Sequence, residues 1–185
     1  MNLPNKITLA RIFLIPLFIV VLMCGKWTGM LELYFNIGAA LVFAVAALTD
    51  GIDGYLARKN NQVTDLGKFL DPIADKLLVA AALICLVELQ RIPAYMVIII
   101  IAREFIVTGL RIVAISNGIV MAAEMTGKIK TVIQIVATVI SILFSGIMVG
   151  PVSLGYIAML IATLFTIYSG YVYLSKNWEM VINSK

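Results

Sequence analysis

Six long apolar stretches, separated by short polar breaks, are the feature that most constrains this chain. They run over 7–24, 31–48, 69–87, 93–115, 129–149 and 154–174. A helix needs about 20 apolar residues to cross the hydrocarbon core of a bilayer, so the sequence predicts an all-α integral membrane protein with six transmembrane helices. The chain has 185 residues, of which 62% are hydrophobic, and six spans leave no length for a separate soluble domain. We therefore expect residues 1–185 to form one membrane-embedded domain.

The basic residues of the polar breaks predict the orientation of these spans. If the N-terminus is cytoplasmic, 12 of the 14 lysines and arginines fall on the cytoplasmic side, and only Lys26 and Arg91 fall outside. Cytoplasmic segments of membrane proteins carry an excess of Lys and Arg. We therefore expect both termini on the cytoplasmic side, together with the polar segment that follows the second span.

The residue types that are missing or rare narrow the possible chemistry. The chain has no histidine and two cysteines, Cys24 and Cys85, which lie within or beside apolar stretches. The composition excludes a histidine base and a histidine-ligated zinc, and the cysteines show neither metal-ligand spacing nor the pattern of a disulfide framework. Any proton transfer therefore falls to a carboxylate, lysine, tyrosine or cysteine.

Acidic and small residues recur at fixed spacing where the second apolar stretch ends. The pattern is D-x2-D-G-x2-A-R-x8-G-x3-D-x3-D, and five of the chain's ten acidic residues fall within these 26 positions. Its members are Asp50, Asp53, Gly54, Ala57, Arg58, Gly67, Asp71 and Asp75. Residues three, four and seven apart share one face of a helix. The second and third spans are therefore each expected to present two carboxylates on one face.

Four neighbouring carboxylates at a membrane edge repel one another unless a cation neutralises them. Oxygen ligands without histidine or cysteine favour a hard divalent ion, Mg²⁺ or Mn²⁺. Two such ions about 4 Å apart can hold a diphosphate during an in-line displacement at phosphorus. The plainer alternative, in which the aspartates are helix caps and solvated loop charges, explains a single aspartate better than the whole set.

The same pattern resembles the signature of the CDP-alcohol phosphatidyltransferases, membrane enzymes that make phospholipids. The resemblance implies that the domain is catalytic and that Asp50, Asp53 and Asp71 ligate the metal ions. It implies that Asp75 contacts metal and is also the base that takes the proton from the attacking alcohol. It further implies nucleotide-binding positions at Asn5, Thr8, Gly54, Ala57, Arg58, Thr64 and Gly67.

Charged residues in the fourth and fifth spans bear on the choice of acceptor alcohol. Arg103 and Arg111 lie close to one helical face, and with Lys128 they can form a cationic pocket for a phosphate. In the alternative interpretation, Lys128 and Lys130 reach the lipid surface and Arg103 pairs with Glu104. A phosphate-bearing acceptor suits the cluster better than choline or ethanolamine, which are cationic.

Three segments sharpen the resemblance: NKITLAR at 5–11, AREFIVTGLR at 102–111 and GKIKT at 127–131. They are similar to the bacterial branch of the family that makes phosphatidylglycerophosphate. This implies transfer of the phosphatidyl group of CDP-diacylglycerol to sn-glycerol 3-phosphate, with release of CMP, in the bacterial cytoplasmic membrane. The expected partners are these substrates and membrane lipids, with no nucleic acid. A homodimer is expected by family analogy alone.

Three alternatives stay open at this point. A member of the same family with another acceptor, such as inositol phosphate, serine or phosphatidylglycerol, would carry the same motif. A cation transporter would line an ion path with the four aspartates, although the fifth and sixth apolar stretches contain no matching carboxylates. A non-catalytic scaffold would keep the fold, but degenerate enzymes usually lose a metal ligand and none is missing here.

Overall fold

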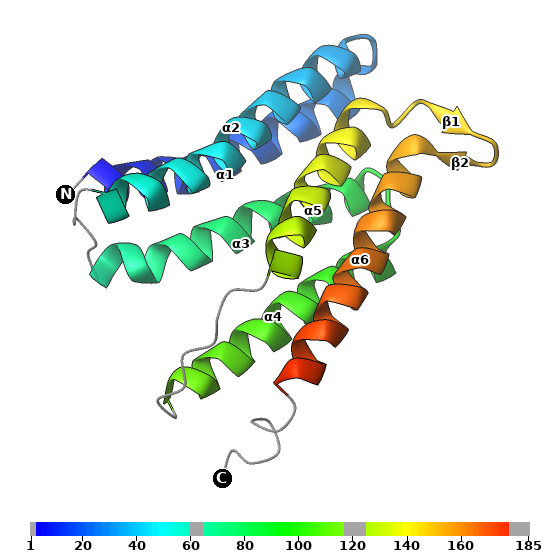
Figure 1. The fold of residues 1–185 in the computed structure, drawn as a ribbon. Coiled ribbons are helices and arrows are strands. Elements are labelled where there is room, and N and C mark those ends of the chain that lie inside the picture. Colours follow the sequence, from blue (N-terminus) through cyan, green and yellow to red (C-terminus); the bar gives the residue numbers. More distant parts are fainter. Residues whose placement is uncertain (1–2, 60–64, 117–124, 178–185) are drawn as a thin grey trace.

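The computed structural model describes residues 3–59, 65–116 and 125–177, with side chains described over 8–29, 31–49, 73–114 and 125–177. The described chain is almost entirely helical (Figure 1). Its α-helices are α1 (Leu3–Thr28), α2 (Glu32–Lys59), α3 (Asp65–Glu88), α4 (Ala94–Ser116), α5 (Met125–Leu143) and α6 (Leu154–Lys176). A short 3-10 helix, η1 (Gly29–Leu31), joins α1 to α2. The predicted all-α fold class is thus confirmed.

Consecutive helices run in alternating directions, and α1 and α2 lie side by side along their length (Figure 1). α1 also packs on α3, α2 packs on α5, and α6 packs on both α4 and α5. Because the directions alternate, the last turns of α2, α4 and α6 and the first turns of α3 and α5 lie at the same end of the bundle. We call this the motif end, and the other end, where α5 is joined to α6, the hairpin end.

A buried apolar core holds the helices together. Phe18 of α1 and Phe43 of α2 are fully buried, and their ring centroids are 5.7 Å apart. Leu83 of α3 and Met159 of α6 are buried in the same cluster. Other large apolar side chains, such as Phe13 at 70% exposure, face outward. A bundle surrounded by lipid is held by close packing between helices, and its outer surface is apolar for the same reason.

Length and composition identify four helices in the described residues as able to cross a membrane, over 8–28, 32–49, 125–143 and 154–176. The chain is therefore a multi-pass membrane protein. Every run of 18 residues within α4 contains Arg103, Glu104 and Arg111. α3, with 24 residues, carries all of its charged residues except Glu88 in its first half. These two helices are long enough to span a bilayer, but most of their charges lie toward the motif end, where several of them line a cavity.

The segment between α5 and α6 corrects one sequence prediction. The fifth apolar stretch was expected to continue to residue 149, but α5 ends at Leu143. Strands β1 (Met148–Val149) and β2 (Val152–Ser153) form a short antiparallel pair there. Gly150 joins them with φ of +65°, a conformation that glycine adopts without strain. The prediction was wrong because apolar composition alone does not distinguish a helix from an apolar turn.

The hairpin end holds the two basic residues that were predicted to face away from the cytoplasm. Lys26 donates to Glu88 at 2.9 Å, in a pair that is exposed on both sides. Arg91, whose side chain is only 9% exposed, donates to Glu32 at 2.9 Å and to Asn36 at 3.0 Å. Its second terminal nitrogen donates to the Ile142 carbonyl oxygen at 2.9 Å. Each cation at this end is therefore matched by a carboxylate.

Candidate active site

The carboxylate motif falls on two helices of the motif end. Positions 50–58 of the motif belong to α2, and positions 67, 71 and 75 belong to α3, so the helical spacing inferred for each half is confirmed. Of the predicted motif side chains, Asp75 is described. The side chains that lie outside the described part are those of Asn5, Asp50, Asp53, Gly54, Ala57, Arg58, Thr64, Gly67 and Asp71. The metal-binding and nucleotide-binding roles of these nine residues stay predictions.

A cavity of about 450 Å³ opens at the motif end among α3, α4, α5 and α6. It brings Asp75 of α3 together with the three predicted acceptor residues, Arg103 and Arg111 of α4 and Lys128 of α5. These four residues are separated by up to 53 positions in the sequence. Charge and spacing predicted the grouping of Arg103, Arg111 and Lys128, and the structure places these three and Asp75 on the wall of one cavity. Their chemical roles stay predictions.

The cavity wall carries more positive than negative charge. Among its described lining residues, the basic ones outnumber the acidic ones by five to two. The basic residues are Lys76, Arg103, Arg111, Lys128 and Lys130, and the acidic ones are Asp75 and Glu104. A cleft lined mainly by one sign of charge concentrates ligands of the opposite sign. The described wall therefore favours an anion.

Glu104 connects two of these cations. Its Oε1 accepts a hydrogen bond from Arg103 Nη1 at 3.1 Å, and Lys130 Nζ donates to the same oxygen. The Lys130 side chain is only 4% exposed, so the interpretation in which it reaches the lipid surface is wrong. The pairing of Arg103 with Glu104 is confirmed, and it coexists with a place for Arg103 in the cavity wall. Sequence reasoning named Glu104 but missed that its partner on α5 is Lys130.

Helix α6 orients both arginines from the far side of the cavity. Arg103 Nη2 donates to Ser169 Oγ at 2.8 Å. Arg111 Nε donates to the Tyr173 hydroxyl at 3.4 Å, and its guanidinium lies 5.6 Å from the centre of the Tyr173 ring. A Cβ added at Gly170 would lie 3.1 Å from Arg103 Cγ, so the small residue leaves room for the arginine. The sequence analysis did not predict these contacts. Ser169 and Tyr173, four residues apart in an apolar span, could have indicated a polar face on this helix.

Lys76 was not predicted as a site residue, yet it lines the cavity beside Asp75. Its Nζ donates to Thr108 Oγ1 of α4, and Thr108 Oγ1 donates to the Glu104 backbone oxygen at 2.7 Å. These bonds tie α3 to the part of α4 that carries the arginines. The position of Asp75 relative to the cationic wall is therefore held by side chains as well as by helix packing.

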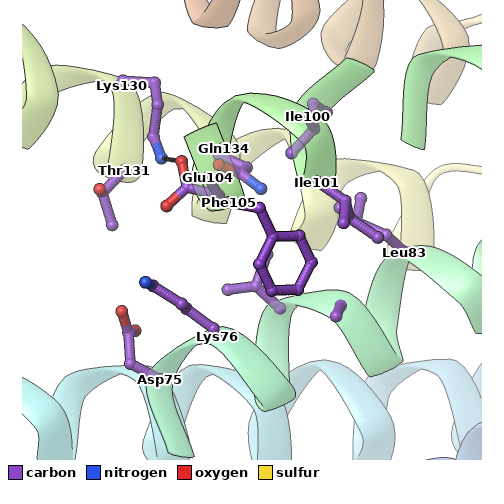
Figure 2. A pocket seen from close by; sticks show the side chains of 12 residues that line it. Asp75, Lys76, Leu83, Ile100, Ile101, Glu104, Phe105, Lys130, Thr131 and Gln134 are labelled. Atoms are coloured by element: carbon purple, nitrogen blue, oxygen red, sulfur yellow. Dashed lines mark hydrogen bonds and ion pairs between the residues drawn. The ribbon is translucent and has the colours of Figure 1, made fainter. Parts of the chain in front are cut away.

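A smaller pocket of about 60 Å³ continues from the cavity between α3, α4 and α5. Figure 2 shows its two sides: the charged groups of Asp75, Lys76, Glu104 and Lys130 lie at one side, and apolar side chains lie at the other. The labelled apolar residues are Leu83, Ile100, Ile101 and Phe105. Gln134 of α5 also lines the pocket. The combined space suits a ligand that is charged at one end and apolar at the other.

The N-terminal part of the site is described only in part. Thr8, which was predicted to contact the nucleotide, lies in α1 and is 1% exposed. Arg11, three residues later, is completely buried. A buried arginine in a membrane helix faces a protein interior rather than lipid. The nucleotide role of Thr8 stays a prediction.

Comparison with known proteins assigns the family. The sequence model of the CDP-alcohol phosphatidyltransferases matches residues 1–168. This chain therefore belongs to the CDP-alcohol phosphatidyltransferase family, as the spacing of its carboxylates predicted. The family assignment extends well beyond the motif and covers α1 to α5 and most of α6.

Individual relatives are similar over nearly their full length. A CDP-diacylglycerol–glycerol-3-phosphate 3-phosphatidyltransferase of Bacillus subtilis is 50% identical over 191 residues, covering 99% of this chain and 98% of the relative. A protein of the same name from Rickettsia felis is 39% identical, with 93% of each chain covered. Another from Pseudomonas fluorescens is 39% identical, covering 96% of this chain and 91% of the relative.

Proposed function

We propose that this chain transfers the phosphatidyl group of CDP-diacylglycerol to sn-glycerol 3-phosphate, releasing CMP and forming phosphatidylglycerophosphate. The observation that carries the proposal is the cavity that joins Asp75 to Arg103, Arg111 and Lys128. The reaction needs a base for the acceptor hydroxyl and an anchor for the acceptor phosphate, and this cavity offers both. Relatives named for this reaction, at 39% and 50% identity, support the same conclusion.

The cationic wall explains the choice of a phosphate-bearing acceptor. Arg103 and Arg111 offer planar guanidinium groups that bind phosphate oxygens in pairs, and Lys128 adds a mobile point charge. Ser169 and Tyr173 hold the two guanidinium groups in place before the ligand arrives. An acceptor anchored in this way presents its free hydroxyl at a fixed distance from the phosphate, and this orientation selects the attacking oxygen.

Asp75 supplies the base. Its carboxylate accepts the proton of the C1 hydroxyl of glycerol 3-phosphate while that oxygen attacks the donor phosphorus that bears diacylglycerol. The new bond joins the acceptor oxygen to this phosphorus, and the bond from the phosphorus to the bridging oxygen of the diphosphate breaks. CMP leaves with the bridging oxygen. A positioned base of this kind typically contributes about 10²–10⁴-fold to the rate.

The donor chemistry of the motif fits Mg²⁺ or Mn²⁺, and Asp50, Asp53, Asp71 and Asp75 would hold two such ions. All four ligands are carboxylates, and the described member, Asp75, points toward the pocket from α3 (Figure 2). Ions of this type, when bound, neutralise a diphosphate and stabilise the charge that develops on it. The nucleotide contacts proposed for Asn5, Thr8, Gly54, Ala57, Arg58, Thr64 and Gly67 would place the CDP group beside them.

The orientation in the bilayer follows from charge. We expect the motif end to face the cytoplasm of a bacterial cell, since it carries the large excess of basic residues. The described hairpin end holds two basic residues, Lys26 and Arg91, and so few Lys and Arg are typical of an external side. A cytoplasmic site has direct access to glycerol 3-phosphate and to the nucleotide product.

CMP release by the detergent-purified protein tests the proposal. The protein is given CDP-diacylglycerol and Mg²⁺, with glycerol 3-phosphate, inositol phosphate, serine or phosphatidylglycerol as acceptor, or with none. Release that depends on glycerol 3-phosphate is the expected result. Release that depends on another alcohol alone would keep the family reaction and refute the acceptor. No release with any acceptor, from protein shown to be folded, would refute the proposed reaction.

A further inference from the structure

Gln134 is a buried polar residue that the proposed mechanism does not use. It lies on α5, lines the smaller pocket and is 3% exposed. Its amide nitrogen Nε2 is buried and has no hydrogen-bond partner among the residues that the structure describes. A buried donor without an acceptor is unfavourable, and native proteins leave few of them. The free donor therefore points to a ligand that brings an acceptor oxygen into this pocket.

The depth of Gln134 indicates which part of a ligand it meets. It follows Lys130 by four residues, about one helical turn or 6 Å at 1.5 Å per residue, in the direction away from the motif end. Its pocket includes Leu83, Ile100 and Ile101. Phe105, on the same wall, is 68% exposed, so the apolar side of the pocket reaches the lipid-facing surface of α4.

An uncharged oxygen carried by an apolar chain matches these surroundings. The acceptor's phosphate is placed by the cations nearer the motif end, and its reacting hydroxyl by Asp75. The donor's diacylglycerol leaves the reacting phosphorus toward the bilayer, and its ester carbonyls are the first acceptor oxygens along that path. An amide N–H is a neutral donor, suited to a neutral carbonyl.

We infer that Gln134 donates a hydrogen bond through Nε2 to an ester carbonyl of the diacylglycerol group, in the pocket between α3, α4 and α5. The pocket then takes the glycerol backbone and the first methylenes of one acyl chain. This inference rests on the proposed function for the identity of the donor lipid. It adds a residue that recognises the ester linkage and that takes no part in the proton transfer.

Binding of two donor lipids tests the inference without any acceptor present. CDP-diacylglycerol is compared with its diether analogue, which has the same chains and lacks the ester carbonyls, by calorimetry with the detergent-purified protein. The diester is expected to bind about tenfold more tightly, the size of one net hydrogen bond to a buried group. Equal affinity of the unaltered protein for the two lipids would overturn the inference, and this comparison needs no substitution.

Two variants localise the effect. Gln134→Met keeps the length of the side chain and removes the donor, so both lipids should bind with the affinity of the diether. Thr138→Val is the matched control, since Thr138 is a fully buried residue of the same helix whose hydroxyl is bound to the Gln134 backbone oxygen at 2.8 Å. It should keep the tenfold difference. An unchanged difference in Gln134→Met, shown by gel filtration to be folded, would overturn the inference.

A second measurement, the acceptor preference in CMP release, distinguishes this inference from its main alternative and from the proposed function. In the alternative, Gln134 donates its hydrogen bond to the 2-hydroxyl of the acceptor. This alternative predicts that Gln134→Met abolishes the preference for glycerol 3-phosphate over 1,3-propanediol phosphate in CMP release, and that result would overturn the ester assignment. A rate of CMP release that does not depend on glycerol 3-phosphate would refute the proposed acceptor. The comparison of diester and diether binding would still decide the role of Gln134.

Discussion

The two ends of the helix bundle differ in how their described basic residues are balanced by acidic ones. At the hairpin end, Lys26 and Arg91 are each paired with a glutamate. At the motif end, the described cavity wall has five basic residues and two acidic ones. Charge placed in a membrane protein is costly unless it is paired or solvated. The paired end is therefore explained by structure alone, whereas the surplus of basic residues on the described cavity wall favours an anionic ligand.

The same contrast appears within the motif end itself. Glu104 neutralises Lys130, the most deeply buried of the cations that line the cavity, and so resembles the pairs of the hairpin end. Lys128 is exposed, and Arg111 is bound to a neutral hydroxyl and ring. Buried charge is thus balanced inside the protein, and the accessible charge is left for substrate. Four experiments test this difference between the two ends.

The largest effect is expected from metal removal. Chelation with EDTA should abolish CMP release, because the carboxylates of the motif are left without the cations that hold a diphosphate. Addition of excess Mg²⁺ or Mn²⁺ should restore it. CMP release in the presence of EDTA, with metal shown to be absent by elemental analysis, would contradict the metal assignment.

The next largest effect is expected from Asp75→Asn, which keeps the shape of the side chain and removes the base. The kcat for CMP release should fall by about 10²–10⁴-fold, with membrane insertion unchanged. Glu88→Gln is the matched control, since it also neutralises one carboxylate but at the hairpin end, and its activity should equal that of the unaltered protein. Normal turnover by Asp75→Asn would refute the assignment of the base.

A smaller effect is expected from Lys128→Met. Loss of a charge-assisted hydrogen bond costs about 1.5–3 kcal/mol, so the KM for glycerol 3-phosphate should rise by about 10–100-fold. The KM for CDP-diacylglycerol should change little. Lys26→Met makes the same replacement at the hairpin end and should leave both values unchanged. An unchanged KM in Lys128→Met would mean that Lys128 only extends to the lipid surface.

The smallest effect on activity is expected from Arg91→Met. The nearly buried guanidinium binds Glu32, Asn36 and the Ile142 carbonyl, so its loss should lower the free energy of unfolding by about 1–3 kcal/mol. Thermal unfolding in detergent measures this. The activity of the folded protein should not change. A large rise in the KM for glycerol 3-phosphate would show that the two ends are not independent.

Much of the fold and part of the site could be predicted because membrane-spanning helices are marked by long apolar stretches of sequence. The apolar stretches located all six helices; most boundaries differ by six residues or fewer, and the largest difference, 11 residues, is at the end of α2, which continues past residue 48 to Lys59. Arg103, Arg111 and Lys128 were grouped with one another because charged residues in apolar spans usually face a protein interior or a cavity. The end of α5 was misjudged because residues 144–149 are apolar, yet form a turn and the strand β1.

The pairing of side chains across helices was not predictable in the same way. Glu104 precedes Lys130 by 26 residues, and the sequence gives no reason to join them rather than Glu104 and its neighbour Arg103 alone. Ser169 and Tyr173 are two of several polar residues in α6, and their arginine partners lie 66 and 62 residues away. Such pairs depend on the rotation of each helix about its axis, and residue spacing within one helix does not fix that rotation.

Local composition and spacing predicted the class of the protein, the positions of its helices and the ligand chemistry of its motif. Hydrophobic length sets what can cross a bilayer, and spacing within a helix sets which carboxylates share a face. Contacts between helices set which cations stay available for a ligand, because Glu104 binds Lys130 and leaves Lys128 exposed. They also placed the Gln134 donor in an apolar pocket. Both outcomes depend on how α3, α4, α5 and α6 pack, and only contacts between helices specify that packing.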